Sequence, residues 1–473
     1  MQHPAPKQWD PSAAIPIAAG LYAMLAEDNA GWLFFAGIPG ALVLMAGLAL
    51  LLMRGDARVT AYMALGSGLG VLLAIPAAFS GGFGQALVAA ILFGMSFVTS
   101  GRIALRDEPP PLTVPRPENH IRLQAKAALD ELLLGYFVGS ASLPSGAVAE
   151  RMCAEAKRLP DLIQRRGWAT DLDLLHVAPP LPTHVRVQTA RTFGYDYERV
   201  SFESGWVPDP ELPGAEAWRT LNNNGTAVAN VFRHPGPPRP WLVCIHGYRM
   251  GTPMLDLSLF PPGRLHHQLG LNVLMPTLPL HGPRKLGRRT GDRYLDGNLL
   301  DLIAAQCQAL WDLRRWLAWL REVQQAPAIG VCGVSLGGYN AALLSQYVSY
   351  LDFVMATVPV IDLADTLYRF IPAVHRRYFE ENGLDIEAYR RMLHLVSPTA
   401  RPSLVPQAHR HIVGAIADRV VLPRNPIALS EHWGVPVNWY QGSHLSVRGE
   451  EVVDRVLDAA MRAAWPDAVL GSY

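Results

Sequence analysis

Ser335 is the residue of this sequence best suited to nucleophilic chemistry. It lies between Gly333 and Gly337, after the apolar run 328–332 and before the apolar run 341–347. A buried strand before such a turn and a helix after it lift the serine Oγ clear of a sheet. The glycines are needed because a Cβ at either position would meet the neighbouring strand or helix. The pattern therefore predicts a serine nucleophile on a sharp turn.

The elements that must position this serine follow from an alternation of short apolar runs and helix-like segments. The run 241–245 has no polar alternation, as expected for a strand buried on both faces. Further strand-like runs follow it at 271–275, 328–332, 353–357, 411–415 and 435–439. Strands that alternate with helices favour an α/β fold, with a mostly parallel sheet and helices on both faces.

These features together resemble the α/β-hydrolase superfamily, and most of all its serine esterase and lipase-like members. The resemblance covers about 241–465. It rests on the Gly-x-Ser-x-Gly turn, on His246-Gly247 at the end of a strand, and on the chain order serine, aspartate, histidine. It implies the α/β-hydrolase fold and a serine hydrolase that cleaves an ester through an acyl-enzyme intermediate.

The resemblance also implies an acid and a base in loops that follow later strands. Asp418 comes after the run 411–415, and Asp362, in an earlier loop, is the alternative acid. His444 follows the last strand-like run in a loop of small residues, from which an imidazole can reach the serine. The expected roles are attack by Ser335, proton transfer by His444, and orientation of the imidazole by Asp418.

An oxyanion hole needs two donors aimed at the charge that develops during attack. One donor would be the backbone N–H of Leu336, which follows the nucleophile. The resemblance assigns the other to Tyr248, in the loop that begins with His246 and Gly247, where the glycine lets the backbone approach closely. A purely structural turn is the alternative for this loop.

A cation-rich loop follows the run 271–275. Its candidate anion-binding residues are Arg284, Lys285, Arg288 and Arg289, and Asp292 is the acid among them. Because ligands bind at the carboxyl edge of a parallel sheet, these cations could face a phospholipid substrate or the inner leaflet of a membrane. The alternative is a solvated loop whose charges pair with nearby carboxylates.

The first hundred residues contain uncharged apolar stretches near 32–53, 59–79 and 83–100. A helix over the first would be about 33 Å long, enough to cross a hydrocarbon core of about 30 Å. The third stretch is the shortest, so two or three spans are possible. With three spans, the loop arginines (Arg54, Arg58, Arg102 and Arg106) predict an outside N-terminus and a cytoplasmic catalytic domain. If the third stretch is only interfacial, the N-terminus would lie inside, and the rest would stay inside only if 81–100 re-enters from the cytoplasmic face. We expect a multi-pass membrane module over 1–106, with membrane lipids as partners.

The remaining organisation follows from prolines and periodicity. The proline-rich stretch 107–120 reads as a semi-rigid linker. A middle segment over 121–225 begins with a helix whose apolar side should carry Leu129, Leu132, Leu133 and Phe137. The catalytic domain then spans 226–473, with a helical insertion near 362–406 that could form a lid or an ordinary part of the core.

Composition limits the classes of function. The chain has 41 Lys+Arg and 40 Asp+Glu, a net charge of +1, so it lacks the basic field of a nucleic-acid-binding protein. The 4 cysteines match no Cys-x-x-Cys spacing and favour a reduced compartment. We expect no metal and no cofactor.

The sequence thus favours a membrane-anchored serine hydrolase that acts on an ester, with lipid esters as plausible substrates. A thioesterase or acyltransferase would use the same triad, because fold does not choose among these reactions. A catalytically inactive membrane scaffold is the alternative from another class, although the intact triad speaks against it. The oligomeric state is left open.

Overall fold

The structure, a computed structural model, describes residues 11–53, 55–296 and 298–466. Arg54, one of the arginines that predict the orientation in the membrane, lies outside the described residues. The chain divides into two compact units. Unit 1 comprises Met1–Ala141, Ala415–Arg424 and Trp439–Glu450, and unit 2 comprises Ser142–Gly414, Asn425–Asn438 and Glu451–Tyr473.

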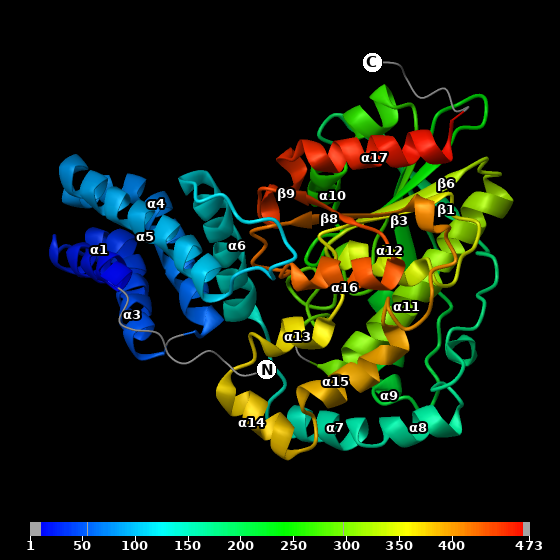
Figure 1. The fold of residues 1–473 in the computed structure, drawn as a ribbon, viewed down its shortest axis with the longest axis horizontal. Coiled ribbons are helices and arrows are strands. Elements are labelled where there is room, and N and C mark those ends of the chain that lie inside the picture. The colour runs from blue at the N-terminus through cyan, green and yellow to red at the C-terminus, as the bar shows by residue number, and fades with distance from the viewer. Residues whose placement is uncertain (1–10, 54, 297, 467–473) are drawn as a thin grey trace. The chain divides into compact units, whose positions relative to one another are not determined.

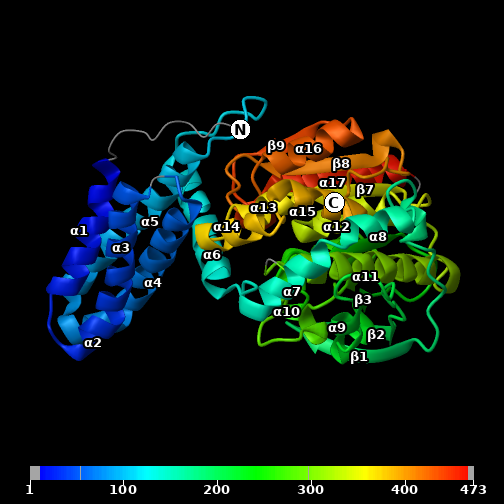
Figure 2. The ribbon, with the colours of Figure 1, turned by 90° about the horizontal axis from the view of Figure 1, so that it is seen from below.

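Unit 1 is mainly helical, and Figure 2 shows α1, α3, α4 and α5 side by side. Its helices are α1 (Ala14–Leu25), α2 (Ala30–Trp32), a π-helical turn (Leu33–Gly37), α3 (Ile38–Leu52), α4 (Ala57–Gly81), α5 (Phe83–Asp107) and α6 (Ile121–Ser140).

Three helical stretches of unit 1 are long and apolar enough to cross a membrane: Ala30–Leu52, Ala57–Gly81 and Phe83–Asp107. They coincide with the three predicted stretches. The third is longer than expected, 25 residues, because its helix continues past Ser100 through Arg102 and Arg106. Helix α1, which the sequence analysis did not predict, belongs to a shorter apolar helix over Pro11–Leu25.

Helix α6 buries only part of the side that apolar spacing predicts. Leu129, expected on that side, is 46% exposed, whereas Leu132, Leu133 and Phe137 are half-buried. The fully buried positions include Leu123, Leu134 and two acidic residues, Asp130 and Glu131. The prediction was wrong for Leu129 and missed the two carboxylates, because it assumed that carboxylates face water, whereas here they have buried hydrogen-bond donors. Helix α6 packs on α4 and α5 within unit 1.

The sheet has nine strands in the order β1-β2-β3-β5-β4-β6-β7-β8-β9. The strands are β1 (Arg186–Thr192), β2 (Tyr195–Glu203), β3 (Thr226–Phe232), β4 (Trp241–Ile245), β5 (Asn272–Pro276), β6 (Ile329–Val334), β7 (Phe353–Thr357), β8 (Arg410–Ala415) and β9 (Val437–Tyr440). Strands β1 to β3 pair antiparallel, and β3 pairs antiparallel with β5. The pairs from β5 through β4, β6 and β7 to β8 are parallel.

Helices cover both faces of the sheet, with α17 on one side and α11 and α12 on the other (Figure 1). The remaining bounds are α7 (Gly146–Ala156), α8 (Leu159–Arg165), α9 (Ala215–Arg219), α10 (Pro253–Leu259), α11 (Leu299–Ala318), α12 (Leu336–Leu344), α13 (Leu363–Tyr368), α14 (Ala373–Glu381), α15 (Ile386–Leu393), α16 (Arg424–Trp433) and α17 (Glu451–Ala464). Helices α13 to α15 come between β7 and β8 in the chain. The predicted α/β class and mostly parallel sheet are confirmed.

Candidate active site

Ser335 lies on the turn between β6 and α12, with φ 60° and ψ −116°. A positive φ is costly for a residue with a Cβ, so this backbone is strained. Its neighbours must be glycines. A Cβ on Gly333 would clash with the Gly337 carbonyl oxygen, and a Cβ on Gly337 would clash with the Ile245 carbonyl oxygen. The close approach of the first turn of α12 to the end of β6 explains Gly333, and its close approach to β4 explains Gly337. Ser335 is left partly exposed.

His444 and Asp418 lie together in unit 1. The Nδ1 of His444 is 2.7 Å from Oδ2 of Asp418. The other oxygen of Asp418 accepts hydrogen bonds from the backbone N–H groups of Val420, at 3.0 Å, and Val421, at 2.7 Å. These donors hold the carboxylate in place, so that it fixes the orientation of the ring.

The hydrogen bond to Asp418 determines which nitrogen of His444 can act as a base. Since a carboxylate only accepts, Nδ1 carries the proton, and Nε2 of the neutral ring has a free lone pair. Burial by itself would lower the pKa of His444, but the charge of Asp418, its hydrogen bond and the charge of Asp130 outweigh burial, so the pKa is raised. The neighbouring charges therefore favour the protonated form of His444, the imidazolium, beside Asp418.

Asp362, the alternative acid, has a different role in unit 2. Its Oδ1 accepts a hydrogen bond from the N–H of Asp365 at 2.9 Å and so caps the start of α13. Its Oδ2 accepts from Nε of Arg390 at 2.8 Å. This carboxylate is occupied by a helix cap and an ion pair.

The loop after β4 lies beside the nucleophile. A Cβ built on Gly247 would be 3.6 Å from the Cβ of Ser335 and 3.5 Å from the carbonyl oxygen of Val334. These are ordinary contacts, so the glycine allows close approach here without being sterically required. The hydroxyl of Tyr248 faces Asp296 at 3.4 Å, which leaves its backbone as the part that could serve the site.

His246 braces the same loop. Its Nε2 accepts a hydrogen bond from the N–H of Leu278 at 3.0 Å, and its Nδ1 donates to the carbonyl of Gly247 at 2.8 Å. Burial lowers the pKa of His246 to about 4, so the ring is neutral at physiological pH. Asp256, which the sequence analysis missed, accepts from the N–H of Gly251 at 3.0 Å and holds the far end of the loop.

The cation-rich loop does not present Arg284 to solvent. Its side chain is 1% exposed and pairs with Oδ2 of Asp312 at 2.7 Å. It also donates to the carbonyls of Thr277, at 3.1 Å, and Asn224, at 2.9 Å. An arginine in this position cannot contact an external anion, so the expectation for Arg284 is corrected. Its physical reason is the buried carboxylate on α11, which lies far along the sequence.

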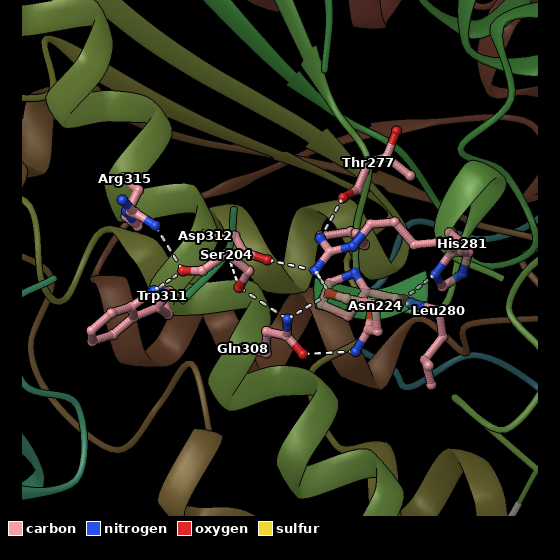
Figure 3. A network of polar contacts seen from close by, with 12 residues as sticks. Ser204, Asn224, Thr277, Leu280, His281, Gln308, Trp311, Asp312 and Arg315 are labelled. Carbon is pink, nitrogen blue, oxygen red and sulfur yellow. Dashed lines mark hydrogen bonds and ion pairs between the residues drawn. The ribbon is translucent and has the colours of Figure 1, made fainter. Parts of the chain in front are cut away.

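Figure 3 shows the polar network around this ion pair. Ser204 donates to Asp312 Oδ1 at 2.6 Å, and Gln308 donates to the Ser204 hydroxyl at 3.0 Å. The side chain of Asn224 donates to Gln308 at 2.7 Å and accepts from the N–H of Leu280 at 3.1 Å. The network ties α11 to the loop after β5.

The other predicted cations of this loop are nearer the surface. The Nε of Arg289 lies 3.6 Å from Oδ1 of Asp292. Lys285 and Arg288 are exposed, and Nζ of Lys285 donates to the carbonyl of Arg288 at 3.2 Å. Over the described residues, no cluster of histidine, cysteine, aspartate or glutamate could hold a metal ion.

The structure thus brings Asp418 and His444 together within unit 1, and Gly247 and Ser335 together within unit 2. Sequence reasoning missed Asp130 as well, whose carboxylate accepts from the backbone N–H of His444 at 2.8 Å. The only sequence signal for it was the adjacent acidic pair Asp130-Glu131 inside an otherwise apolar helical pattern.

Comparisons with known proteins give relatives but no assigned activity. No family model matches the sequence. Among solved structures, the chain is similar to an acetyl xylan esterase from Paenibacillus sp. R4, with a TM-score of 0.43, 16% identity, and coverage of 69% of this chain and 98% of that one. It is also similar to acetyl xylan esterase 1 from Thermoanaerobacterium sp. JW/SL YS485, with a TM-score of 0.42, 12% identity, and coverage of 70% and 98%.

Two curated proteins of Mycobacterium tuberculosis are more similar in sequence. They are the uncharacterized protein MT2702 of strain CDC 1551 and the uncharacterized protein Rv2627c of strain H37Rv. Each is 36% identical over 370 residues, which cover 78% of this chain and 88% of the relative. The chain therefore belongs to the same family as these two mycobacterial proteins, and its parallel sheet and strand–turn–helix elbow give it the α/β-hydrolase fold.

Proposed function

We propose that this protein is a membrane-anchored serine hydrolase that cleaves a carboxylic ester through an acyl-enzyme intermediate. The observation that carries the proposal is the Asp418–His444 pair, with Nδ1 held at 2.7 Å from the carboxylate, in a chain whose strained Gly-x-Ser-x-Gly turn presents Ser335. A neutral imidazole held in this tautomer is a general base, and a serine is the nucleophile that such a base activates.

In the proposed reaction, the Oγ of Ser335 attacks the ester carbonyl while Nε2 of His444 takes the hydroxyl proton. The C–O bond to the alcohol then breaks, and the imidazolium returns the proton to the leaving alcohol. Water attacks the acyl-enzyme by the same route, with His444 again as the base. Asp418 stabilises the imidazolium in both steps without taking the proton.

The oxyanion hole is proposed to use the backbone N–H of Leu336 and an N–H from the loop 246–249, with Tyr248 as the assigned donor. Two features support this assignment. Leu336 is the first residue of α12, where backbone N–H groups lack helical partners. The loop 246–249 approaches the nucleophile closely at Gly247 and is braced by His246.

The membrane side of the proposal has its own support. Three helical stretches long and apolar enough to span a bilayer precede the hydrolase fold. Anchoring would raise the effective concentration of lipid-borne esters near the site. We propose that the catalytic part faces the cytoplasm, because Arg58, Arg102 and Arg106 flank the spans and arginines beside a span favour the cytoplasmic side of a membrane. The exposed Lys285 and Arg288, with Arg289 beside them, remain proposed contacts for anionic lipid headgroups.

A fluorophosphonate probe tests the proposed mechanism. Membranes that contain the wild type should incorporate the probe, and mass spectrometry of the peptides should place it on Ser335. Labelling should vanish in Ser335→Ala, while Ser345→Ala, a buried serine elsewhere on unit 2, should keep it. A folded, membrane-inserted wild type that takes up no probe would contradict the proposal and favour the inactive scaffold.

The lipid contact needs a separate test. Binding to vesicles with and without anionic lipid should be compared for the wild type and for Arg288→Glu. Weaker binding of the variant only to anionic vesicles would support the contact. Unchanged binding and unchanged turnover on anionic lipid esters would remove it.

A further inference from the structure

Helix α6 carries two adjacent carboxylates, Asp130 and Glu131, each 0% exposed. Buried carboxylates are costly unless they are hydrogen-bonded or paired with a cation. Both belong to unit 1, as do the loops that carry Asp418 and His444. The three donors to Asp130, and one of the two donors to Glu131, lie in those loops.

Asp130 binds the backbone of both loops at once. Its Oδ2 accepts from the N–H of Arg419 at 3.0 Å and from the N–H of His444 at 2.8 Å. Its Oδ1 accepts from the N–H of Leu445 at 3.0 Å. One carboxylate therefore joins the residue that follows the acid to the residue that is the base. The side chain of Asp130 thus directly limits the separation of the two loops.

Backbone bonds also join the two loops before the catalytic residues. The N–H of Ile416 donates to the carbonyl of Tyr440 at 3.1 Å, and the N–H of Ala417 donates to that of Gly442 at 2.9 Å. Asp130 adds its hydrogen bonds two residues farther on, at Arg419 and His444. These positions adjoin the contact between the side chains of Asp418 and His444.

Glu131 connects the same loop to the apolar helices. Its Oε1 accepts from Nε of Arg419 at 3.0 Å, and its Oε2 accepts from the hydroxyl of Thr60 on α4 at 2.8 Å. Arg419 also pairs, at 2.5 Å, with Glu108, which directly follows α5. Arg419, next to Asp418, is thereby held directly by Glu131 of α6 and by Glu108 at the end of α5, and it is linked to α4 through Glu131.

A second contact ties α6 to the histidine loop. Nζ of Lys126 lies 2.6 Å from Oε1 of Glu450, and the hydroxyl of Ser446 donates to the same oxygen at 2.7 Å. The N–H of Ser443 in turn donates to Ser446 at 3.0 Å. The loop that carries His444 is thus fixed to α6 at two places, at His444 and Leu445 through Asp130 and at Glu450 through Lys126.

We propose that Asp130 is a positioning residue for the Asp418–His444 pair, and that Glu131 and Arg419 link this pair to the apolar helices α4 and α5. The inference rests on the proposed function and deepens it. On this account the N-terminal helices are part of the catalytic apparatus, since they hold the acid and the base in place, and they do more than attach a hydrolase to a membrane.

The charges around His444 give the proposal an electrostatic readout. The groups that act on this imidazole are Asp418 and Asp130, both negative when ionised. Burial and the charge of Asp418 raise the pKa of Asp130 to about 7, against the opposing effects of His444 and the backbone donors. Because ionised Asp130 favours the imidazolium, its removal should lower the pKa of His444. A purely structural contact elsewhere would not move that pKa.

The experiment uses the full chain in detergent or membranes, with Asp130→Asn as the main variant. In this variant an amide NH₂ group replaces one oxygen of the Asp130 carboxylate. It then faces a backbone N–H group whose hydrogen bond it cannot accept, and the negative charge is lost. We expect the rate of fluorophosphonate labelling of Ser335, and kcat for p-nitrophenyl butyrate, to fall by about tenfold or more, because small displacements of catalytic groups are costly. KM should change little, and the acid limb of the pH profile should move to lower pH.

The matched control removes a carboxylate that is exposed to solvent. Asp161 on α8 pairs with Arg165, and its side chain is 72% exposed. Asp161→Asn should leave the labelling rate, kcat and the pH profile as in the wild type. If folded Asp130→Asn were labelled at the wild-type rate with an unchanged pH profile, the proposal would be overturned.

A further variant keeps the test decisive if Asp130→Asn does not fold. Thr60→Val keeps the side-chain shape and removes the bond to Glu131, together with the hydroxyl's bond to the carbonyl of Ala57 on the same helix. It should lower the labelling rate by about two- to fivefold, because one hydrogen bond to Glu131 is lost. An unchanged rate would overturn the link to α4. Where Asp130→Asn folds, hydrogen exchange of the segments 415–424 and 439–450 should be faster in it than in Asp161→Asn. Equal exchange would overturn the positioning role.

The exchange measurement also separates the two proposals. If the wild type takes up no fluorophosphonate, the proposed function fails, whereas the exchange rates still report whether Asp130 orders the two loops. If the wild type is labelled on Ser335 and Asp130→Asn behaves like the control, the proposed function stands and only the positioning role fails.

Discussion

Asp418 and His444 lie 2.7 Å apart through Oδ2 and Nδ1, and a third residue, Asp130, accepts hydrogen bonds from the backbone on both sides of this contact. The pair is therefore held twice, through its side chains and through its main chain. An acid and a base fixed in this way lose little conformational freedom when a substrate binds, which is the condition for efficient proton transfer.

The role of Asp418 can be separated from that of Asp362 by the same substitution at both sites. Asp418→Asn should lower kcat by about 10⁴-fold, because the amide favours the wrong imidazole tautomer. Asp362→Asn should keep kcat within about twofold, since it only weakens the cap of α13 and the pair with Arg390. Steady-state hydrolysis of p-nitrophenyl butyrate provides the measurement. A larger loss in the Asp362 variant would transfer the role of acid to that residue.

The pH dependence should follow His444. Because only the neutral ring accepts the serine proton, kcat/KM should rise as pH rises through the pKa of His444, which lies above its usual value of 6.5. The raised pKa of His444 also makes the stability of the folded state depend on pH. A raised histidine pKa stabilises the folded state below 6.5, and this stabilisation is lost as pH rises through the folded pKa. An activity profile whose acid limb has its midpoint below 6.5 would contradict the assignment.

The buried Arg284–Asp312 pair should matter for stability and not for anion binding. Arg284→Met leaves the carboxylate of Asp312 buried without its cation, so we expect a loss of about 3–5 kcal/mol in the free energy of unfolding. The double variant Arg284→Met/Asp312→Leu should recover part of this loss. Thermal unfolding in detergent would show the effect, with the exposed Arg288→Met as control. An Arg284→Met protein as stable as the control would argue against the pair.

The glycines around the nucleophile should differ in their tolerance. Gly337→Ala places a Cβ against the Ile245 carbonyl oxygen, so the variant should lose folded protein or shift β4 away from α12. Gly247→Ala meets only ordinary contacts at 3.5 Å and beyond and should fold normally. Yield and thermal unfolding of the two variants provide the comparison. Equal stability of both would mean that β4 and α12 are farther apart than the structure shows.

Features encoded locally were predictable from the sequence. The elbow at Ser335 depends on residues within a few positions of it, and the apolar stretches of the N-terminal helices have a length set by the bilayer. The parallel sheet followed from the alternation of strands and helices. Each of these depends on periodicity or on neighbours in the chain, which a single sequence displays.

Features that depend on distant partners were not predictable. Asp130 and His444 are 314 positions apart, and no periodic pattern links them. The buried carboxylates of α6 were missed because the pattern of its leucines was visible while the donors for Asp130 and Glu131 were not. Arg284 was assigned to the surface for the same reason, since its partner Asp312 lies on a separate helix.

The measurement that tests the central claim most directly is detection of the acyl-enzyme. The protein would be mixed with p-nitrophenyl butyrate, quenched in acid and analysed by peptide mass spectrometry, beside Ser335→Ala. We predict a butyryl group on the peptide that contains Ser335, together with a burst of p-nitrophenolate of about one equivalent per site, as covalent catalysis requires. Ester hydrolysis by the wild type that persists in Ser335→Ala, with no acylated peptide, would contradict the account.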